Sequence, residues 1–308
     1  MTVLDSMFSN IFVVLEANSE IQPALDRAQQ IAELNGAKIT LRIGAKSRVA
    51  EISKDVEETA NFVEGSEARA LLQKNCEDFL KMLAKPVREK GIEVTFSIGW
   101  AEDAVNGIIE SAITAEADLL VKASRHHSKL KTLFYTPTDW KLLRKCPSPV
   151  LMVHSEKPQQ PKQTLAAVSA VSVDEEHHQL DQKVLSYASA FSELFNANLK
   201  VINAFTPVAM GVSLDGSGIY QEEYLQDLEK QHHNKTLELT RKFNISDNQV
   251  ETRNGDPNMA INECVEELGI DLVVLGTLAR EGLTGVFVGN TAEQVLERLD
   301  CEILTVKQ

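Results

Sequence analysis

The stretch from Asp271 to Gln294 reads D-L-V-V-L-G-T-L-A-R-E-G-L-T-G-V-F-V-G-N-T-A-E-Q, and its pattern indicates the class of fold. Its apolar run Leu272–Leu275 ends at Gly276, which is typical of a buried parallel strand. Three more glycines follow, at Gly282, Gly285 and Gly289. Asn290 and Thr291 then favour a helix start, because both residue types cap helices well. The segment therefore predicts a strand, a glycine-rich loop and a helix N-terminus.

Such an arrangement suits phosphate binding. Glycines let backbone N–H groups approach a ligand, and a helix N-terminus offers unpaired donors with a partial positive charge. A glycine-loosened surface loop would carry the same residues, so the segment alone does not decide between a binding loop and an ordinary one.

An earlier copy of the stretch runs from Asp118 to Val153 without a gap, 153 positions before Asp271 to Val306. A constant offset near half the chain length indicates two similar domains. The first copy lacks the glycines. Ala123, His126, Thr136 and Pro137 stand at the places of Gly276, Ala279, Gly289 and Asn290 in the second copy.

The 308 residues suit two domains of about 150 residues each. Residues 155–163 (S-E-K-P-Q-Q-P-K-Q) carry two prolines and no large apolar side chain, which indicates a linker. We therefore expect domains at residues 1–155 and 156–308, the first with a degenerate loop. Strands are expected at 11–15, 38–43, 93–98, 119–122, 150–153, 165–171, 199–204, 249–253, 272–275 and 302–306. Helices are expected at 23–34, 68–90, 103–115, 137–145, 176–195, 220–243, 259–268 and 291–299. This alternation predicts an α/β fold with parallel sheets and helices on both faces.

Composition excludes several classes of partner. A net charge of −14 and a pI near 5.0 argue against binding to nucleic acid or an anionic membrane. The four cysteines form no C-x-x-C pair, which favours reduced thiols in a cytoplasm. The N-terminal residues do not resemble a signal peptide, and no apolar run approaches the roughly 20 residues of a membrane span. We therefore expect a cytoplasmic protein.

The loop resembles the nucleotide-binding motif of the universal stress protein family, G-x-x-G-x9-G-[ST]. Gly276 and Gly289 match its first and third glycines, whereas Ala279 and Asn290 stand at the second glycine and the hydroxyl position. Residues 253–275 resemble the family's G-x-P, helix and D-L-V-V approach to this loop, and the resemblance covers nearly the whole chain. It implies two tandem domains, each a five-stranded parallel sheet of the Rossmann-like, adenine nucleotide alpha hydrolase-like type. It also implies a role in the stress response and binding of ATP or another adenine nucleotide by the loop.

The candidate nucleotide-binding residues in the second domain are Gly276, Thr277, Ala279, Arg280, Gly289, Asn290, Thr291 and Ser169. Nucleotide-binding members of the family carry an Asp after the first strand, and this chain has Glu16 there in the first domain and Ser169 or Ser172 in the second. Asp174 is interpreted as a helix cap. In the first domain, Glu16, Ser124, His126 and Thr136 are candidates for a pocket that holds a different anion or a metal ion.

Three histidine pairs, at positions 126–127, 177–178 and 232–233, are interpreted as solvated surface residues, with His126 as the exception. Adjacent side chains diverge, so no pair predicts a metal site by itself. Lys122 could be buried with a lowered pKa, but we favour an amine in water with a packed stem. Asp118 and Asp271, each just before a strand, are interpreted as caps for strand entry.

No catalytic motif is present: the chain contains no G-x-S-x-G, no H-E-x-x-H and no Walker A sequence. We therefore expect a protein that is not an enzyme, although weak ATPase activity remains compatible with the loop. Two functions stay open. One is binding of a nucleotide or other small ligand in the second domain, and the other is an assembly protein that binds no nucleotide. The apolar final strands at 150–153 and 303–306 favour intramolecular pairing of the domains, with further homo-oligomers left open.

Overall fold

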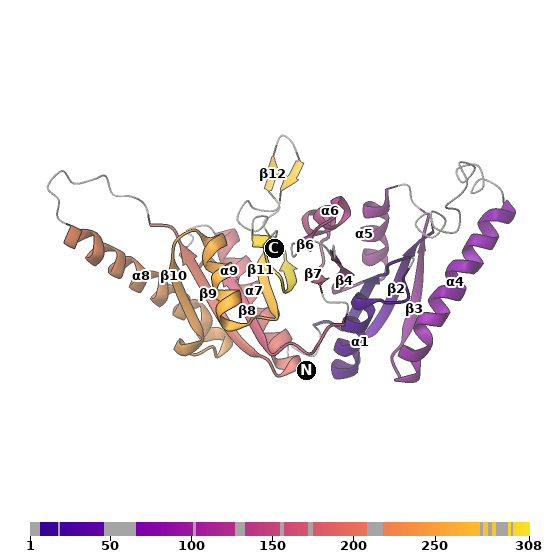
Figure 1. Cartoon of the computed structure of the whole chain (residues 1–308), viewed down its shortest axis with the longest axis horizontal. Helices are drawn as coiled ribbons and strands as arrows, with labels where there is room; N and C mark the ends of the chain where they lie inside the picture. The colour runs from indigo at the N-terminus through magenta and orange to yellow at the C-terminus, as the bar shows by residue number, and fades with distance from the viewer. Residues whose placement is uncertain are drawn as a thin grey trace. The chain divides into compact units, whose positions relative to one another are not determined.

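The computed structural model describes residues 7–17, 19–45, 66–100, 103–126, 133–154, 157–171, 175–207, 218–277, 280–282, 285–287, 295–296 and 298–308. The chain forms two compact units, distinguished by colour along the chain in Figure 1. Unit 1 comprises Met1–Lys129 and Phe134–Gln160, and unit 2 comprises Leu130–Leu133 and Pro161–Gln308. The proposed domain boundary between residues 155 and 156 stays a prediction.

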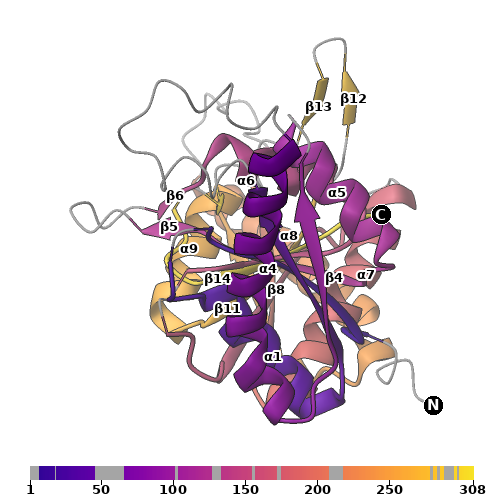
Figure 2. The same ribbon diagram turned by 90° about the vertical axis from the view of Figure 1, so that its right-hand side faces the viewer.

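Unit 1 alternates strands and helices. Its main strands are β1 (Asn10–Val14), β2 (Lys38–Gly44), β3 (Val94–Gly99), β4 (Leu119–Ala123) and β7 (Val150–Val153). Its helices are α1 (Pro23–Asn35), α4 (Ser66–Glu89), α5 (Ala104–Thr114) and α6 (Pro137–Lys145). Helix α4 packs on β2 and β3, and Figure 2 shows it running along the sheet.

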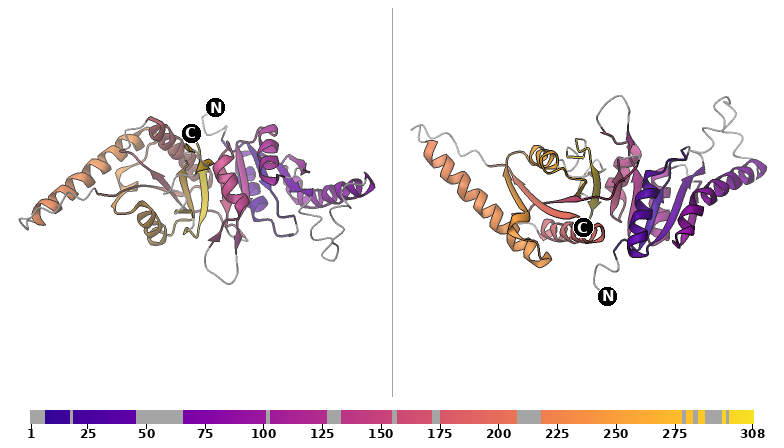
Figure 3. Two further views of the ribbon diagram at one scale, coloured as in Figure 1. Left: turned by 90° about the horizontal axis from the view of Figure 1, so that it is seen from above. Right: turned by 60° about the horizontal axis from the view of Figure 1, so that its bottom comes forward.

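Unit 2 repeats this order. Its main strands are β8 (Gln163–Val168), β9 (Asn198–Phe205), β10 (Val250–Asn254), β11 (Leu272–Gly276) and β14 (Glu302–Val306). Its helices are α7 (Glu175–Phe195), α8 (Gly218–Thr240) and α9 (Pro257–Leu268), with short 3-10 turns η2 (Arg241–Phe243) and η3 (Asp247–Gln249). Helix α8 packs on β9 and β10, as Figure 3 shows.

Each unit contains a five-stranded sheet in which all strands are parallel, as the sequence predicts. The strand order is β3-β2-β1-β4-β7 in unit 1 and β10-β9-β8-β11-β14 in unit 2. Strand registers reproduce the repeat, since Ile11 pairs with Leu119 in unit 1 and Thr164 pairs with Leu272 in unit 2. Thr164 lies 153 positions after Ile11, and Leu272 lies 153 positions after Leu119. The offset in the sequence therefore corresponds to a repeat of the structure.

Helix boundaries follow local chemistry. Helix α1 begins with Pro23 and ends at Gly36, whose φ of 76° is the left-handed conformation that glycine adopts readily. The carboxylates of Asp103 and Asp256 accept backbone N–H bonds at the first turns of α5 and α9. Helix α6 begins at Pro137 and ends at Lys145, the range expected from the sequence.

Asp118 and Asp271 directly precede β4 and β11. Each binds the backbone at the start of the first strand of its unit, which is β1 in unit 1 and β8 in unit 2. Asp118 accepts hydrogen bonds from the backbone N–H groups of Ser9 and Asn10, at 2.8 and 3.0 Å. Asp271 accepts equivalent bonds from Lys162 and Gln163, at 2.7 and 2.9 Å. Their interpretation as strand-entry caps is confirmed.

The predicted linker is partly fixed to unit 1. The carbonyl of Gln159 accepts a 2.7 Å hydrogen bond from the buried guanidinium of Arg27, and the carbonyl of Pro158 accepts one from Gln30, also at 2.7 Å. Both donors lie on α1. Backbone hydrogen bonds therefore hold residues 158–159 against a helix, which composition alone does not predict.

The predicted glycine-rich loop contains a hairpin that the sequence analysis missed. Strands β12 (Arg280–Gly282) and β13 (Gly285–Phe287) pair antiparallel, with Gly282 opposite Gly285. The first half of the chain has short strands at the corresponding positions, β5 (Arg125–His126) and β6 (Leu133–Phe134). In the part of the chain that the structure describes, no helix combines the length and the apolar character that crossing a bilayer requires.

Candidate functional site

In each unit the central strands end at the edge where parallel α/β sheets place their ligands. In unit 2 these strands are β8 and β11, which are neighbours and are followed by Ser169 and Thr277. In unit 1 they are β1 and β4, followed by Leu15–Glu16 and Ser124. The topology thus brings most of the predicted site residues to two equivalent edges.

Gly276 closes β11, but a helix takes the space beside it. A Cβ atom added there would lie 2.6 Å from both Cγ and Cδ2 of Leu180 on α7. Leu180 is buried. The missing side chain of Gly276 is therefore required by helix packing, which is a different role from the ligand contact expected of a glycine in this motif.

Thr277 is buried, at 2% exposure. Its backbone N–H donates to the Val306 carbonyl at 2.8 Å, and its hydroxyl donates to the same oxygen at 3.4 Å. Ser124 makes the same two bonds to Val153 in unit 1, at 2.9 and 3.4 Å. Both residues therefore tie the end of one strand to the final strand of their unit, and neither donor is directed to a ligand.

The backbone N–H of Ser169 donates to both carboxylate oxygens of Asp181 on α7, at 3.0 and 3.1 Å. Asp181 is 6% exposed, and burial raises its pKa to about 6 despite this bond and the nearby His177 and His178. Unit 1 uses a neutral group for the same task, since Gln22 Oε1 accepts the backbone N–H of Glu16 at 3.0 Å.

The remaining predicted residues of the nucleotide loop are incompletely described. Ala279, Gly289, Asn290 and Thr291 lie outside the described residues, as does Asp174. Arg280 is described only through the backbone of β12.

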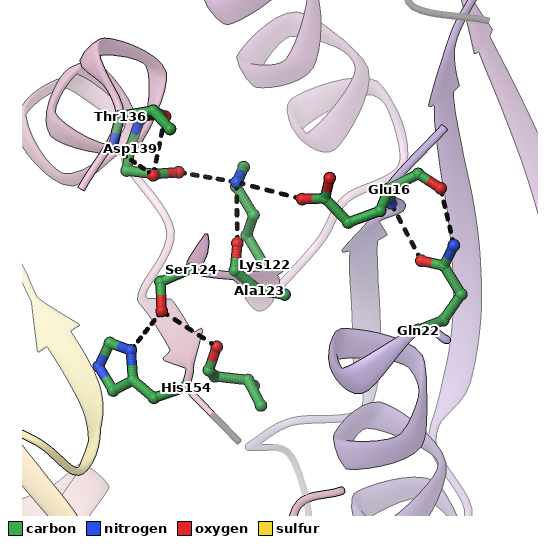
Figure 4. Close-up of polar contacts among 9 residues, drawn as sticks. Glu16, Gln22, Lys122, Ala123, Ser124, Thr136, Asp139 and His154 are labelled. Atoms are coloured by element: carbon green, nitrogen blue, oxygen red, sulfur yellow. Dashed lines mark hydrogen bonds and ion pairs between the residues drawn. The ribbon is translucent and has the colours of Figure 1, made fainter. Parts of the chain in front are cut away.

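The unit 1 edge carries a buried charge cluster (Figure 4). The ammonium of Lys122 lies 2.8 Å from Asp139 Oδ1 and 3.9 Å from Glu16 Oε1, and it donates to the Ala123 carbonyl at 2.9 Å. Lys122 is 8% exposed and Asp139 is fully buried. The favoured interpretation of Lys122, with its amine in water, is therefore wrong. The amine lies within the protein because two carboxylates and a carbonyl compensate its charge.

Asp139 also completes the N-terminus of α6. Its Oδ2 accepts the backbone N–H of Thr136 at 2.7 Å and the Thr136 hydroxyl at 2.8 Å, while that hydroxyl accepts the N–H of Asp139 at 3.2 Å. This is a capping box. An internal carboxylate thus lies where the helix N-terminus would attract an external anion.

Ser124 belongs to a separate contact. Its hydroxyl shares a hydrogen bond with Nδ1 of His154 (Figure 4). Nε2 of His154 lies 3.3 Å from the Tyr135 hydroxyl. The three residues are between 6% and 9% exposed, so this Ser–His pair is a core contact and is not presented to a substrate. His126 lies in β5, and its side chain is outside the described set.

Three of the four predicted first-domain residues thus divide between two clusters. Glu16 and Thr136 meet through Lys122 and Asp139, and Ser124 faces His154. The sequence analysis missed Asp139, His154 and Asp181. The spacing T-x-x-D at 136–139 is a capping-box pattern that would have revealed Asp139, whereas no local pattern identifies the other two.

The histidine pair at 232–233 is not solvated as expected. His232 stacks on Phe205 with ring centroids 4.1 Å apart, its Nδ1 lies 2.9 Å from Asn203 Oδ1, and burial lowers its pKa. His233 contacts Thr252 at 3.1 Å and Asp247 at 2.7 Å. Both side chains dock α8 on strands β9 and β10. His178 is exposed, in agreement with the expectation for the second pair, and His177 is half-buried.

Metal and thiol chemistry find little support at these edges. The described residues contain no group of three or more metal-ligating side chains. All four cysteines are buried, and burial raises the pKa of Cys264 to about 11 and that of Cys301 further. Protonated, enclosed thiols are poor nucleophiles.

Comparison with known proteins gives a consistent answer. The model of the universal stress protein family matches residues 7–154 and again residues 170–307. The chain is similar to universal stress protein E of Photorhabdus laumondii, with 31% identity over 302 residues that cover 97% of this chain and 95% of the relative. It is 29% identical to universal stress protein E of Escherichia coli K12 over 303 residues, which cover 98% and 95%.

Solved structures agree. A universal stress protein from Pseudomonas aeruginosa matches with a TM-score of 0.75 at 27% identity and covers 99% of this chain and 94% of its own. A universal stress protein from Archaeoglobus fulgidus matches with a TM-score of 0.65 at 17% identity, over 97% and 98% of the two chains. The second likeness concerns the fold alone.

Proposed function

Because the chain belongs to the universal stress protein family, we propose that it acts in the cytoplasmic stress response by binding a nucleotide or another small ligand in its second domain. The binding segment is Gly276–Thr291 together with Ser169. The ligand class is ATP or another adenine nucleotide, held weakly and not hydrolysed at a useful rate.

The observation that supports this proposal most is the difference between the two equivalent edges. In unit 1, Lys122, Asp139 and Glu16 compensate one another, and Asp139 already caps the helix that would face a phosphate. In unit 2 the residues 153 positions later are Leu275, Ala292 and Ser169, which carry no charge. The three positions of unit 2 that correspond to this cluster therefore carry no charged side chain that would compete with a phosphate.

The described contacts also explain why we expect weak binding. The donors of Thr277 are used on Val306, and Leu180 takes the space beside Gly276. Phosphate contacts must then come from the segment around Gly289–Thr291, where Asn290 replaces the hydroxyl of the family motif. Each lost hydrogen bond to a charged group weakens binding by about tenfold or more.

An assembly protein that binds no nucleotide is the second candidate. The hydrogen bonds of Thr277 and the packing of Gly276 favour it, since both residues have structural roles that need no ligand. A separate anion or metal site at the unit 1 edge is less suited to the geometry, because the charge of Lys122 is already compensated.

Native mass spectrometry of the freshly purified full chain distinguishes these candidates, followed by calorimetric titration with ATP. We expect Gly289→Leu to abolish binding, because a side chain would block backbone access. Thr136→Ala, at the equivalent position in unit 1, is the matched control and should leave ATP affinity unchanged. No co-purified ligand together with no measurable ATP binding favours the assembly function.

A further inference from the structure

One face of strands β2 and β3 is polar where a parallel sheet is normally apolar on both sides. Alternate residues Lys38, Thr40 and Arg42 of β2 share it with residues of β3, since Thr40 lies opposite Thr95 and Arg42 lies opposite Ser97. Helix α5 covers part of this face and packs on β3. Between them lies a cavity of about 460 Å³. We call it the β2–β3 cavity. It is lined by Asn10, Lys38, Thr40, Glu93, Thr95, Phe96, Ser97, Glu110, Ser111, Thr114 and Ala115.

A buried cation is hydrogen-bonded to Ser97, one of the residues that line the β2–β3 cavity. Arg42 is 5% exposed, and burial lowers its pKa. Its Nη1 donates to Ser97 Oγ at 3.2 Å, and its Nη2 donates to the Gly107 carbonyl at 3.3 Å. Among the described residues no carboxylate forms an ion pair with it, and its Nε has no hydrogen-bond partner. A buried charge without a counter-ion is costly, so this position favours an external anion.

The hydrogen bonds set which groups the cavity offers. Because Arg42 donates to Ser97 Oγ, the Ser97 hydroxyl hydrogen remains to donate into the cavity. The hydroxyl groups on α5 have the opposite role, because they donate to the helix backbone. Ser111 donates to the Gly107 carbonyl at 2.7 Å, and Thr114 donates to the Glu110 carbonyl at 2.8 Å. Their oxygens can then only accept. The strand wall near Arg42 thus suits an anion, and the helix wall suits hydroxyl donors.

The acidic residues limit the ligand to one anionic end. Glu93 directly precedes β3, at the end of the sheet face remote from Arg42. Lys38 and Arg42 are four positions apart along β2, which is about 13 Å of strand. The carboxylates of Glu93 and Glu110 can accept hydrogen bonds from the hydroxyl groups of a ligand, but they repel a second negative charge on it.

We propose that the β2–β3 cavity of unit 1 binds a small anion that carries several hydroxyl groups, such as a phosphorylated sugar, with its anionic end at Ser97, whose hydroxyl oxygen accepts a hydrogen bond from Arg42. This site lies on a different part of the chain from the proposed nucleotide loop. The described strands β9 and β10 of unit 2 do not repeat these polar residues. The strand registers place Ile202 at the position of Arg42, and Lys200 and Glu251 at those of Thr40 and Ser97. Lys200 and Glu251 pair with each other at 3.1 Å.

Calorimetric titration of the full chain with ribose 5-phosphate tests this site, with inorganic phosphate and ribose as its two separate parts. We expect ribose 5-phosphate to bind more tightly than either part. Ser97→Ala removes the donor, and Arg42→Ile copies unit 2 and removes the cation, so each should weaken binding by about tenfold or more. Arg42→Ile should not lower the melting temperature, because it removes an uncompensated buried charge.

Ser186→Ala is the matched control. Its hydroxyl donates to the Gln182 carbonyl on α7 at 2.8 Å, as Ser111 donates to Gly107 on α5, but it lies in unit 2. Affinity should be unchanged. If Arg42→Ile fails to fold, Ser97→Ala still decides. The proposal is overturned if ribose 5-phosphate does not bind at millimolar concentration, if phosphate alone binds as well, or if Ser97→Ala binds like the wild type.

Discussion

The two units have the same arrangement of strands and helices, but they differ in the charged residues at the carboxyl ends of their central strands. The positions that fix the strands are repeated, as Asp118 and Asp271 show, and so are the ties from Ser124 and Thr277 to the final strand. The residues at the edge where ligands are expected are not repeated between the units. Unit 1 encloses Lys122 with two carboxylates, and unit 2 has Leu275 at that place. Residues that fix strands are thus conserved between the copies, and residues that face a ligand diverge.

The largest expected effect comes from breaking the unit 1 charge cluster. Asp139→Ala leaves the ammonium of Lys122 buried beside only the more distant Glu16 and removes the capping box of α6. Removing one partner of a buried ion pair costs about 3–5 kcal/mol. Urea denaturation followed by circular dichroism should show unit 1 unfolding at much lower denaturant concentration.

The residues of unit 2 supply the control. Leu275 and Ala292 occupy the positions of Lys122 and Asp139, so the double substitution Lys122→Leu with Asp139→Ala copies unit 2 into unit 1. It should recover most of the lost stability, because the one charge that remains of the cluster is that of Glu16, which is partly exposed to solvent. A double variant as unstable as Asp139→Ala would show that Asp139 acts through the helix cap and not through Lys122.

The second effect concerns pH. Asp181 accepts the Ser169 N–H in unit 2, where unit 1 uses the neutral Gln22. Burial raises the pKa of Asp181 from its ordinary value of 3.8 to about 6. The folded state therefore binds the proton more tightly than the unfolded state. The stabilisation is complete below the unfolded pKa and is lost as pH rises through about 6, by about 3 kcal/mol at most.

Asp181→Asn tests this sign. The variant keeps an acceptor for Ser169 but does not titrate, so the stability of unit 2 should no longer fall between pH 4 and pH 7 through this group. Denaturant midpoints measured across that range for both proteins give the answer. Identical pH profiles would mean that Asp181 does not hold its proton in the folded state.

The third effect is steric. Gly276→Ala places a Cβ atom 2.6 Å from Leu180 in unit 2, and such overpacking costs about 1–3 kcal/mol. Leu180→Ala in the same chain should relieve the overlap, so the two substitutions should combine to a smaller loss than their sum. In unit 1 the equivalent residue is already Ala123. Thermal melting of the four proteins measures the coupling, and simple additivity would contradict the packing role of Gly276.

The sequence predicted the scaffold well because parallel strands are short apolar runs and helices have capped ends. The range of α6, the limits of β7 and β14 and the 153-residue offset all followed from such local patterns. The site was predicted less well. Lys122 and Asp139 are 17 positions apart, and only the fold brings the amine to the carboxylate. The role of Gly276 depends on Leu180 in a helix nearly a hundred residues earlier. Pairing of the two domains through their final strands stays a prediction.

The smallest effect concerns the nucleotide loop itself, which has glycines in the second copy and none at the corresponding positions of the first. Ala279→Gly with Asn290→Ser restores the family motif between Gly276 and Gly289. Backbone access at position 279 and a hydroxyl at the helix start should together strengthen ATP binding by about tenfold, or about 1.4 kcal/mol. The net charge of −14 opposes a triphosphate in both proteins alike, so it cancels in the comparison. Calorimetry at fixed salt measures the ratio. Low-micromolar binding by the wild type, or no gain in the restored loop, would refute this interpretation of residues 279 and 290.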